Sequence, residues 1–118
     1  MVHKALDAAE KLAKERIQAE IIDLRTLSPI DWDTVIESVE KTGRLVVVDE
    51  ANPRCSIATD VAAHVAQEAF GALKAAPKMV TAPHTPVPFS PTLEDLYIPS
   101  GDAIVKAVAQ TTSKAMAA

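Results

Sequence analysis

The sequence contains few cysteine, glycine and aromatic residues. These shortages exclude an internal disulfide, a glycine-rich nucleotide-binding loop and an aromatic core. Of its 118 residues one is cysteine and three are glycine, while Phe, Trp and Tyr make up 3%. The single Cys55 rules out an internal disulfide and fits a reducing compartment. Gly43, Gly71 and Gly101 share no loop, which excludes a dinucleotide-binding fingerprint and a P-loop. Because 48% of the residues are nonetheless hydrophobic, the core must be aliphatic.

Basic clusters and long apolar runs are also missing. The formal charge is −4, and without a basic patch a nucleic-acid partner is not expected. No apolar run approaches the length of a membrane span, and residues 1–4 lead directly into charged helical sequence. We therefore expect a soluble, cytoplasmic protein with no nucleic-acid or membrane partner. Its length suits one domain, residues 1–118, with a core of its own.

The segment from Arg44 to Arg54 is the most informative feature that is present. It opens as an apolar, β-branched run typical of a strand covered on both faces, and then reaches Asp49, Glu50 and a turn broken by Pro53. Strands of this kind belong to parallel sheets. Binding sites and interfaces form at the carboxyl ends of such strands. The first expectation is therefore an α/β protein with a binding site or interface at the carboxyl end of this strand, near Asp49 and Glu50.

Helical periodicity surrounds this strand. A first amphipathic helix is expected to start almost at residue 1 and to reach Ile17. A second is expected to start with either Ser28 or Asp31 as its cap and to stop at Gly43, the usual residue of a left-handed cap. Within it, Glu37 and Lys41 have the spacing of an ion pair.

Two further helices are expected downstream. Ser56 is placed to cap the first of them, in which a stripe of large apolar residues ends at Phe70 beside a stripe of alanines. The last helix starts at Gly101 or Asp102 and runs into an alanine-rich tail that is expected to fray.

Three strands are expected, over residues 19–24, 44–49 and 78–81. With helices on both faces they predict a three-layer α/β/α fold with a mostly parallel sheet. Residues 82–99 contain five prolines and are expected to lack regular structure. They also contain several apolar side chains, so we expect this segment to pack through Phe89, Leu93 and Tyr97 on the domain or on a partner.

Residues with catalytic chemistry are few. Asp60, His64 and Glu68 have helical spacing and are considered as a metal site, but successive turns spread ligands along an axis, which favours a solvated face. His84 is considered as a general base, although no acidic residue lies within seven positions to orient it. Cys55 precedes a helix and follows a basic residue, an environment that activates thiols, yet no histidine is near in sequence.

Asp49 and Glu50 are considered as an acid pair. Adjacent residues of a strand point to opposite faces, which disfavours joint chemistry. One of the two is instead expected to cap the turn or to pair with Arg54 or Arg44.

Three segments carry a resemblance: IDLRTLSPID (22–31), KTGRLVVVDE (41–50) and TAPHTPVPF (81–89). In this order they resemble the C-terminal domain of the β subunit of thiamine-diphosphate-dependent 2-oxo acid dehydrogenases, in the transketolase C-terminal domain family. Residues 49–60 resemble acetoin dehydrogenase β subunits more than the pyruvate or branched-chain enzymes. The pyruvate and branched-chain enzymes tend to have a His before the Glu that corresponds to Glu50, followed by a Gly-Gly-Phe-Gly turn. This chain has Asp49 before Glu50 and the turn Pro-Arg-Cys-Ser at residues 53–56.

The resemblance implies a role in assembly. In such enzymes the thiamine diphosphate and magnesium lie between the α subunit and the N-terminal domain of the β subunit. Accordingly, no residue of this chain is expected to be catalytic, cofactor-binding or metal-binding. The implied partners are the α subunit, a second β subunit and the lipoyl-bearing acyltransferase core that receives the acyl unit. The residues expected at interfaces are Glu50, Arg54, Ile57, Phe89 and Tyr97.

The chain departs from the family in one respect. The family domain begins with a strand just before the first helix, and Met1 falls where that strand should end, so the chain resembles the last third of a β subunit. An unpaired sheet edge is expected to promote self-association, through that edge or through the apolar faces of the first and third helices. Two alternatives remain: a C-terminal domain of a transketolase or deoxyxylulose phosphate synthase, and a free-standing interaction or regulatory module.

Overall fold

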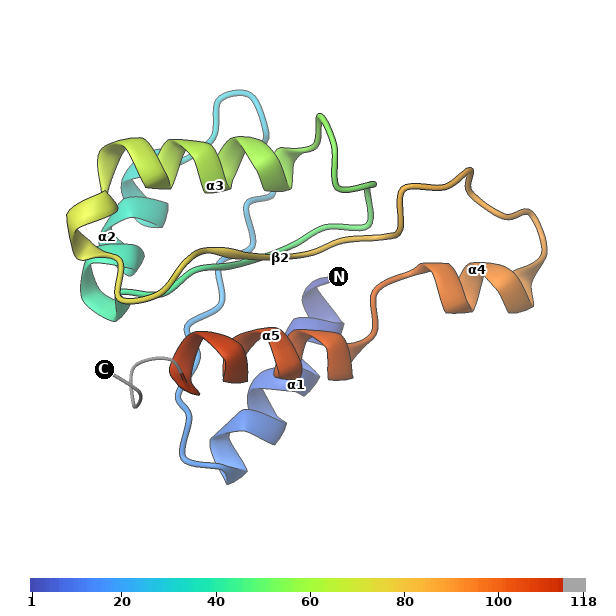
Figure 1. Ribbon diagram of the computed structural model, residues 1–118, viewed down its shortest axis with the longest axis horizontal. Helices are drawn as coiled ribbons and strands as arrows, with labels where there is room; N and C mark the ends of the chain where they lie inside the picture. Colours follow the sequence, from blue (N-terminus) through green and yellow to red (C-terminus); the bar gives the residue numbers. More distant parts are fainter. Residues whose placement is uncertain (114–118) are drawn as a thin grey trace.

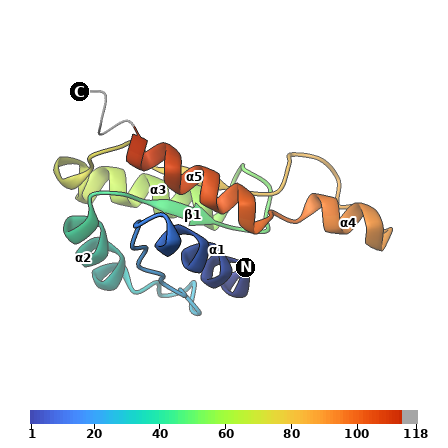
Figure 2. The ribbon, with the colours of Figure 1, turned by 90° about the horizontal axis from the view of Figure 1, so that it is seen from below.

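Two short parallel strands lie between two pairs of helices in the computed structural model, which describes residues 1–113. The elements in chain order are α1 (Val2–Lys14), α2 (Trp32–Thr42), β1 (Val46–Val48), α3 (Ile57–Glu68), the 3-10 turn η1 (Phe70–Ala72), β2 (Lys78–Val80), α4 (Pro91–Tyr97) and α5 (Gly101–Ser113). Helices α2 and α3 lie on one side of the strands and α1 and α5 on the other (Figure 1), and Figure 2 gives the view from below. The expected α/β/α layering is confirmed, while the tail lies outside the described residues.

The sheet is parallel, as the sequence predicts. β1 lies in register with β2, so that Val47 is opposite Met79. Parallel neighbours need a crossover connection, and α3 supplies it. The two strands are short, three residues each, and their stability depends on the helices that cover both faces.

Each face of β1 contributes to its own core. Val47 points toward α2 and α3, whereas Val46 and Val48 point toward α1 and α5, as the alternation of a strand requires. The first core consists of Val35, Val39, Val47, Ala58, Val61, Val65 and Ala69. The second consists of Ala8, Val80, Ile104 and Ala107.

The ends of α2 follow from local chemistry. Asp31, not Ser28, is the cap: its carboxylate accepts hydrogen bonds from the Thr34 hydroxyl at 2.7 Å and from the Thr34 amide at 3.1 Å. These bonds favour the charged form and hold the pKa of Asp31 below its ordinary value. At the other end Gly43 takes the expected left-handed conformation, with φ of 72°.

The strand expected over residues 19–24 does not form. Within the described residues the sheet has two strands, and 17–27 have no regular structure. In Figure 1 this segment crosses the direction of the strands as it passes from the layer of α1 to that of α2. A strand needs a neighbour to satisfy its backbone groups. Among the described residues, no neighbouring strand pairs with residues 19–24.

Two smaller expectations are also wrong. Phe70 does not extend the buried stripe of α3, because the helix ends at Glu68 and the ring, in η1, is 74% exposed. Lys41 does not pair with Glu37. Its ammonium lies 3.0 Å from Glu20 Oε2, so this ion pair links α2 to residues 17–27, which precede it.

The proline-rich segment contains a helix that the sequence analysis excludes. α4 begins at Pro91, which is tolerated because the first helical position needs no amide donor. The amides of Leu93 and Glu94 donate to the carbonyl of Ser90 at 3.0 and 2.9 Å. The prolines therefore delimit this helix and do not prevent it.

Candidate functional site

The first candidate surface is a projecting arm, which we define as residues 83–99. It extends from the end of β2 away from the helical layers and carries α4 (Figure 1). Its apolar side chains are largely open to solvent. Phe89 is fully exposed, and Leu96, Val87 and Leu93 are 79%, 67% and 54% exposed. Exposed apolar side chains that cluster in this way are typical of interaction surfaces, whereas single exposed apolar residues are common on any protein.

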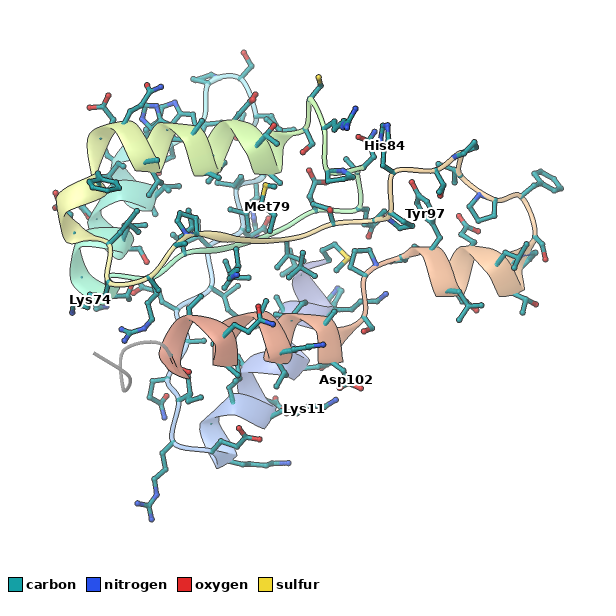
Figure 3. The ribbon with its side chains drawn as sticks, viewed as in Figure 1. Lys11, Lys74, Met79, His84, Tyr97 and Asp102 are labelled. Atoms are coloured by element: carbon teal, nitrogen blue, oxygen red, sulfur yellow. The ribbon has the colours of Figure 1, made fainter. Side chains whose placement is uncertain are left out.

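The arm is anchored at its return to the body. Pro99 is buried and Tyr97 is half-buried, and the ammonium of Lys4 donates to the Pro99 carbonyl at 3.0 Å. Figure 3 shows Tyr97 at the base of the arm. The segment is therefore held at its base while its outer apolar side chains remain free to contact another protein.

The second candidate surface is a groove of about 870 Å³ beside β1. Its walls come from β1, from residues 17–25 and from the inner faces of α1, α2, α3 and α5. Representative lining residues are Leu12, Ile21, Val39, Val46 and Ile104. The groove is partly open to the surroundings, so solvent or another group fills it.

One polar atom at the groove lacks a partner. Ser56 caps α3 and lines the groove. Its amide donates to Thr59 Oγ1 at 3.2 Å, but in the part of the chain that the structure describes its own buried hydroxyl has no hydrogen-bond partner. An unpaired buried hydroxyl is costly. The nearest donor along the chain is the Thr59 amide, which the capping-box arrangement at the start of α3 directs toward the Ser56 side chain.

The residues expected at interfaces fall into two groups. Phe89 and Tyr97 lie on the arm. Glu50, Arg54 and Ile57 lie beyond the carboxyl end of β1, where Ile57 packs against the core of α2 and α3 and lines the groove. Arg54 is exposed, and Glu50 Oε1 lies 3.4 Å from the amino group of Met1. Their roles at an interface stay predictions.

Asp49 stays at the carboxyl end of β1, where it caps the turn. Its carboxylate accepts a hydrogen bond from the Ala51 amide at 3.0 Å. Of the alternatives weighed for the two acids, capping is therefore confirmed, whereas Arg44 turns elsewhere and donates to the Thr111 carbonyl at 3.2 Å.

The other candidate residues do not form a reactive cluster. Within residues 1–113 no group of three His, Cys, Asp or Glu side chains is placed to hold a metal ion. His64 instead stacks on Trp32, with ring centroids 3.8 Å apart. Cys55 is exposed in the turn, with φ of 50°, and His84 is exposed beside Asn52 in a shallow hollow.

Sequence reasoning misses the groove and part of the arm. The exposure of Val87 and Leu96 cannot be predicted from the sequence. The composition of residues 82–99 is equally compatible with packing on the domain and with exposure to solvent. One sequence signal points to the groove: Ile21, Ile22 and Leu24 give residues 19–24 the composition of a strand, and a strand needs a paired neighbour. Separately, every helix among the described residues is too short or too polar to cross a bilayer.

Comparison with known proteins gives one family and a consistent set of relatives. The family described as "Transketolase, C-terminal domain" matches residues 1–104. The β subunit of acetoin:2,6-dichlorophenolindophenol oxidoreductase from Cupriavidus necator is 73% identical over 111 residues, which are 94% of this chain and 33% of that protein. Its Bacillus subtilis counterpart is 59% identical over 104 residues, 88% of this chain and 30% of that protein.

More distant relatives extend the pattern. The β subunit of the pyruvate dehydrogenase E1 component from Bacillus subtilis is 48% identical over 100 residues, 85% of this chain and 30% of that protein. Among solved structures, a split-gene transketolase described as an inactive β4 tetramer superposes with a TM-score of 0.77 at 28% identity, covering 94% of this chain and 35% of that one. The chain thus spans about a third of the length of the curated relatives that it matches.

Proposed function

Because the chain belongs to the transketolase C-terminal domain family, we propose that it is the assembly domain of a β subunit of a thiamine-diphosphate-dependent acetoin or 2-oxo acid dehydrogenase. Identities of 73% and 59% to acetoin oxidoreductase subunits, against 48% to a pyruvate dehydrogenase subunit, favour the acetoin enzymes. The parent enzyme would act in the cytoplasm.

The observation that carries the proposal is the exposed arm. Phe89, Val87, Leu93 and Leu96 present an aromatic ring and three aliphatic side chains on a segment that leaves the body. Aromatic residues are enriched in interfaces, and exposed apolar groups gain most when a partner covers them. The proposed partners are the α subunit, a second β subunit and the lipoyl-bearing acyltransferase core.

The chemistry of the parent enzyme belongs to its cofactor. The proposed reaction cleaves a carbon–carbon bond beside a carbonyl on thiamine diphosphate and passes the acyl unit to lipoamide. The described residues of this chain do not fit that cofactor, since they offer neither a glycine-rich phosphate loop nor a cluster of acidic metal ligands. We therefore assign the chain no step of the reaction and propose that it holds the subunits together.

A chimera tests the proposal. The matching third of the Cupriavidus necator β subunit is replaced by this chain and produced with its α subunit. We expect the two subunits to co-purify and to reduce 2,6-dichlorophenolindophenol in the presence of acetoin. A chimera whose grafted part is folded, by circular dichroism, but which does not associate with the α subunit would contradict the proposal.

The arm is tested in the same chimera by two matched substitutions. Phe89→Ser changes an exposed ring on the arm, whereas Phe70→Ser changes an exposed ring in η1, at the opposite end of the molecule (Figure 1). We expect Phe89→Ser to weaken subunit association at least about tenfold, as for an aromatic anchor at an interface. Phe70→Ser should leave association unchanged. Equal effects of the two would remove the arm from the interface.

A further inference from the structure

The arm is acidic as well as apolar. It contains Glu94 and Asp95 in α4 and has no lysine or arginine. Both carboxylates are exposed, and neither belongs to an ion pair within residues 1–113. Among the described residues, the side chain of Lys4 is the one cationic group that hydrogen-bonds to the arm, and it binds the Pro99 carbonyl. The negative charge of α4 is therefore not compensated by the chain that carries it.

The two acids border the apolar face of α4. At about 3.6 residues per turn, Leu93, Leu96 and Tyr97 share one face of the helix. Glu94 follows Tyr97 around the helix on one side of this face, and Asp95 lies beyond Leu96 on the other. Protein interfaces have the same organisation, with an apolar centre and a polar rim that stays near solvent. The arm thus presents apolar side chains between two carboxylates.

This arrangement restricts what can cover the arm. A surface without cations would take water from the carboxylates and return no partner, which costs binding free energy. An acidic surface would repel them. We propose that the arm binds an apolar hollow that lysine and arginine side chains border on another protein subunit. This inference rests on the proposed function, and it identifies the occupant as the α subunit of the parent enzyme.

A second copy of the chain is a poorer partner for the arm. Oligomers of identical chains most often close around a twofold axis, where the same patch meets itself. Two arms in such a contact would bring the Glu94 and Asp95 carboxylates of both copies together, and like charges that face each other oppose binding. The formal charge of −4 on each copy adds a longer-range repulsion.

The acyltransferase core is also a poorer partner for the arm than the α subunit. Permanent interfaces between subunits are more apolar than transient docking contacts. The arm exposes four large apolar side chains, Val87, Phe89, Leu93 and Leu96. The acids at their border then select a basic partner, while the apolar groups hold it.

Association kinetics test the proposal in the chimera with the Cupriavidus necator β subunit. The α subunit is immobilised, and the rate constants of association and dissociation of the chimera are measured at low and high salt. Glu94→Gln combined with Asp95→Asn removes both charges and keeps the shapes of the side chains. We expect this double substitution to lower the association rate constant about threefold or more at low salt. The difference should disappear near about 1 M salt, where screening acts within roughly 3 Å.

A matched double substitution controls for overall charge. Glu37→Gln combined with Glu40→Gln removes the same net charge from exposed positions of α2, at the other end of the molecule from the arm (Figure 1). It should leave the association rate constant unchanged. Equal effects of the two double substitutions would show that only net charge matters and would overturn the proposal. If the arm variant fails to fold, the single substitutions Glu94→Gln and Asp95→Asn should each give part of its effect.

The outcomes separate this inference from the proposed function. If Phe89→Ser weakens association and removal of the two arm charges does not, the arm stays in the interface but its basic partner surface is overturned. Self-association that Phe89→Ser abolishes would make a second copy the occupant. Binding of the acyltransferase core through the arm, with α-subunit binding unaffected by either change, would make that core the occupant. Either of these last two results also overturns the inference.

Discussion

Lys11 in α1 and Asp102 in α5 form an ion pair between the two ends of the chain. The ammonium nitrogen lies 2.8 Å from Asp102 Oδ1, across 91 positions of sequence, and Figure 3 shows the two side chains next to one another between the helices. The hydrogen bond to Asp102 and its negative charge raise the pKa of Lys11, and the same bond and the positive charge of Lys11 lower the pKa of Asp102.

These shifts predict a pH window for the coupling of Lys11 and Asp102. The lowered pKa of Asp102 means that its contribution is complete above 3.8, its ordinary value, and is lost as the pH falls through the folded-state pKa. The raised pKa of Lys11 means that its contribution is complete below 10.5 and is lost as the pH rises through the folded-state pKa. A double-mutant cycle of Lys11→Met and Asp102→Asn should give favourable coupling in urea unfolding at neutral pH. The coupling should fall as the pH drops below 3.8 and Asp102 is protonated, and it should weaken with salt; coupling that does not decrease in acid would contradict this interpretation.

Two glycine substitutions should differ in a predictable way. Gly43 has φ of 72°, and a Cβ there would lie 2.7 Å from Lys74 Cδ, whereas a Cβ at Gly71 would meet nothing within 4 Å. The left-handed conformation costs a residue with a side chain roughly 1–2 kcal/mol. Gly43→Ala should therefore lower the free energy of unfolding by about that amount, and Gly71→Ala should change it by less than about 0.5 kcal/mol. Equal effects in urea titrations would show that the cap of α2 does not limit stability.

Phe89→Ala should leave the stability of the isolated chain almost unchanged. The ring is fully exposed, so its removal should change the free energy of unfolding by less than about 0.5 kcal/mol. Leu12→Ala is the comparison, because Leu12 is 1% exposed and its truncation should cost about 2–5 kcal/mol. The sole tryptophan, Trp32, reports unfolding for both. A large loss for Phe89→Ala would mean that the arm folds back onto the body in solution.

Thiamine diphosphate should bind this chain weakly or not at all. With no phosphate-binding loop in its sequence, we expect calorimetry with the cofactor and magnesium to give a Kd no tighter than about 1 mM, roughly 4 kcal/mol. The chimera described above is the positive control. Saturable, tighter binding by the chain alone would assign it part of the cofactor site.

Features that depend on residues close together in the sequence are the ones that the sequence predicts best. The cap at Asp31, the left-handed Gly43 and the apolar run of β1 each follow from residues within a few positions of one another, and each forms as expected. Periodicity likewise gives α1 and the alternation of β1 between two cores. The apolar run of β1 also predicts helices on both faces of the sheet, which the structure bears out.

Long-range features are where sequence reasoning fails. The segment 19–24 has the composition of a strand, but pairing depends on a neighbour that composition cannot supply. Lys41 has Glu37 at the favourable spacing and yet binds Glu20, because the chain brings the second acid within reach. The prolines of residues 82–99 predict no regular structure, but Pro91 stands at the start of a helix, where proline is an ordinary first residue.

The packing of α1 against α5 has a consequence for synthesis. Ile104 and Ala107 complete the core in which Ala8 is buried, so the apolar face of α1 cannot be covered until α5 has also left the ribosome. During that interval the apolar face of α1 is available to chaperones and to neighbouring nascent chains. The half built from α2, β1 and α3 needs no such delay, and we expect it to become protease-resistant first in ribosome-bound chains of increasing length.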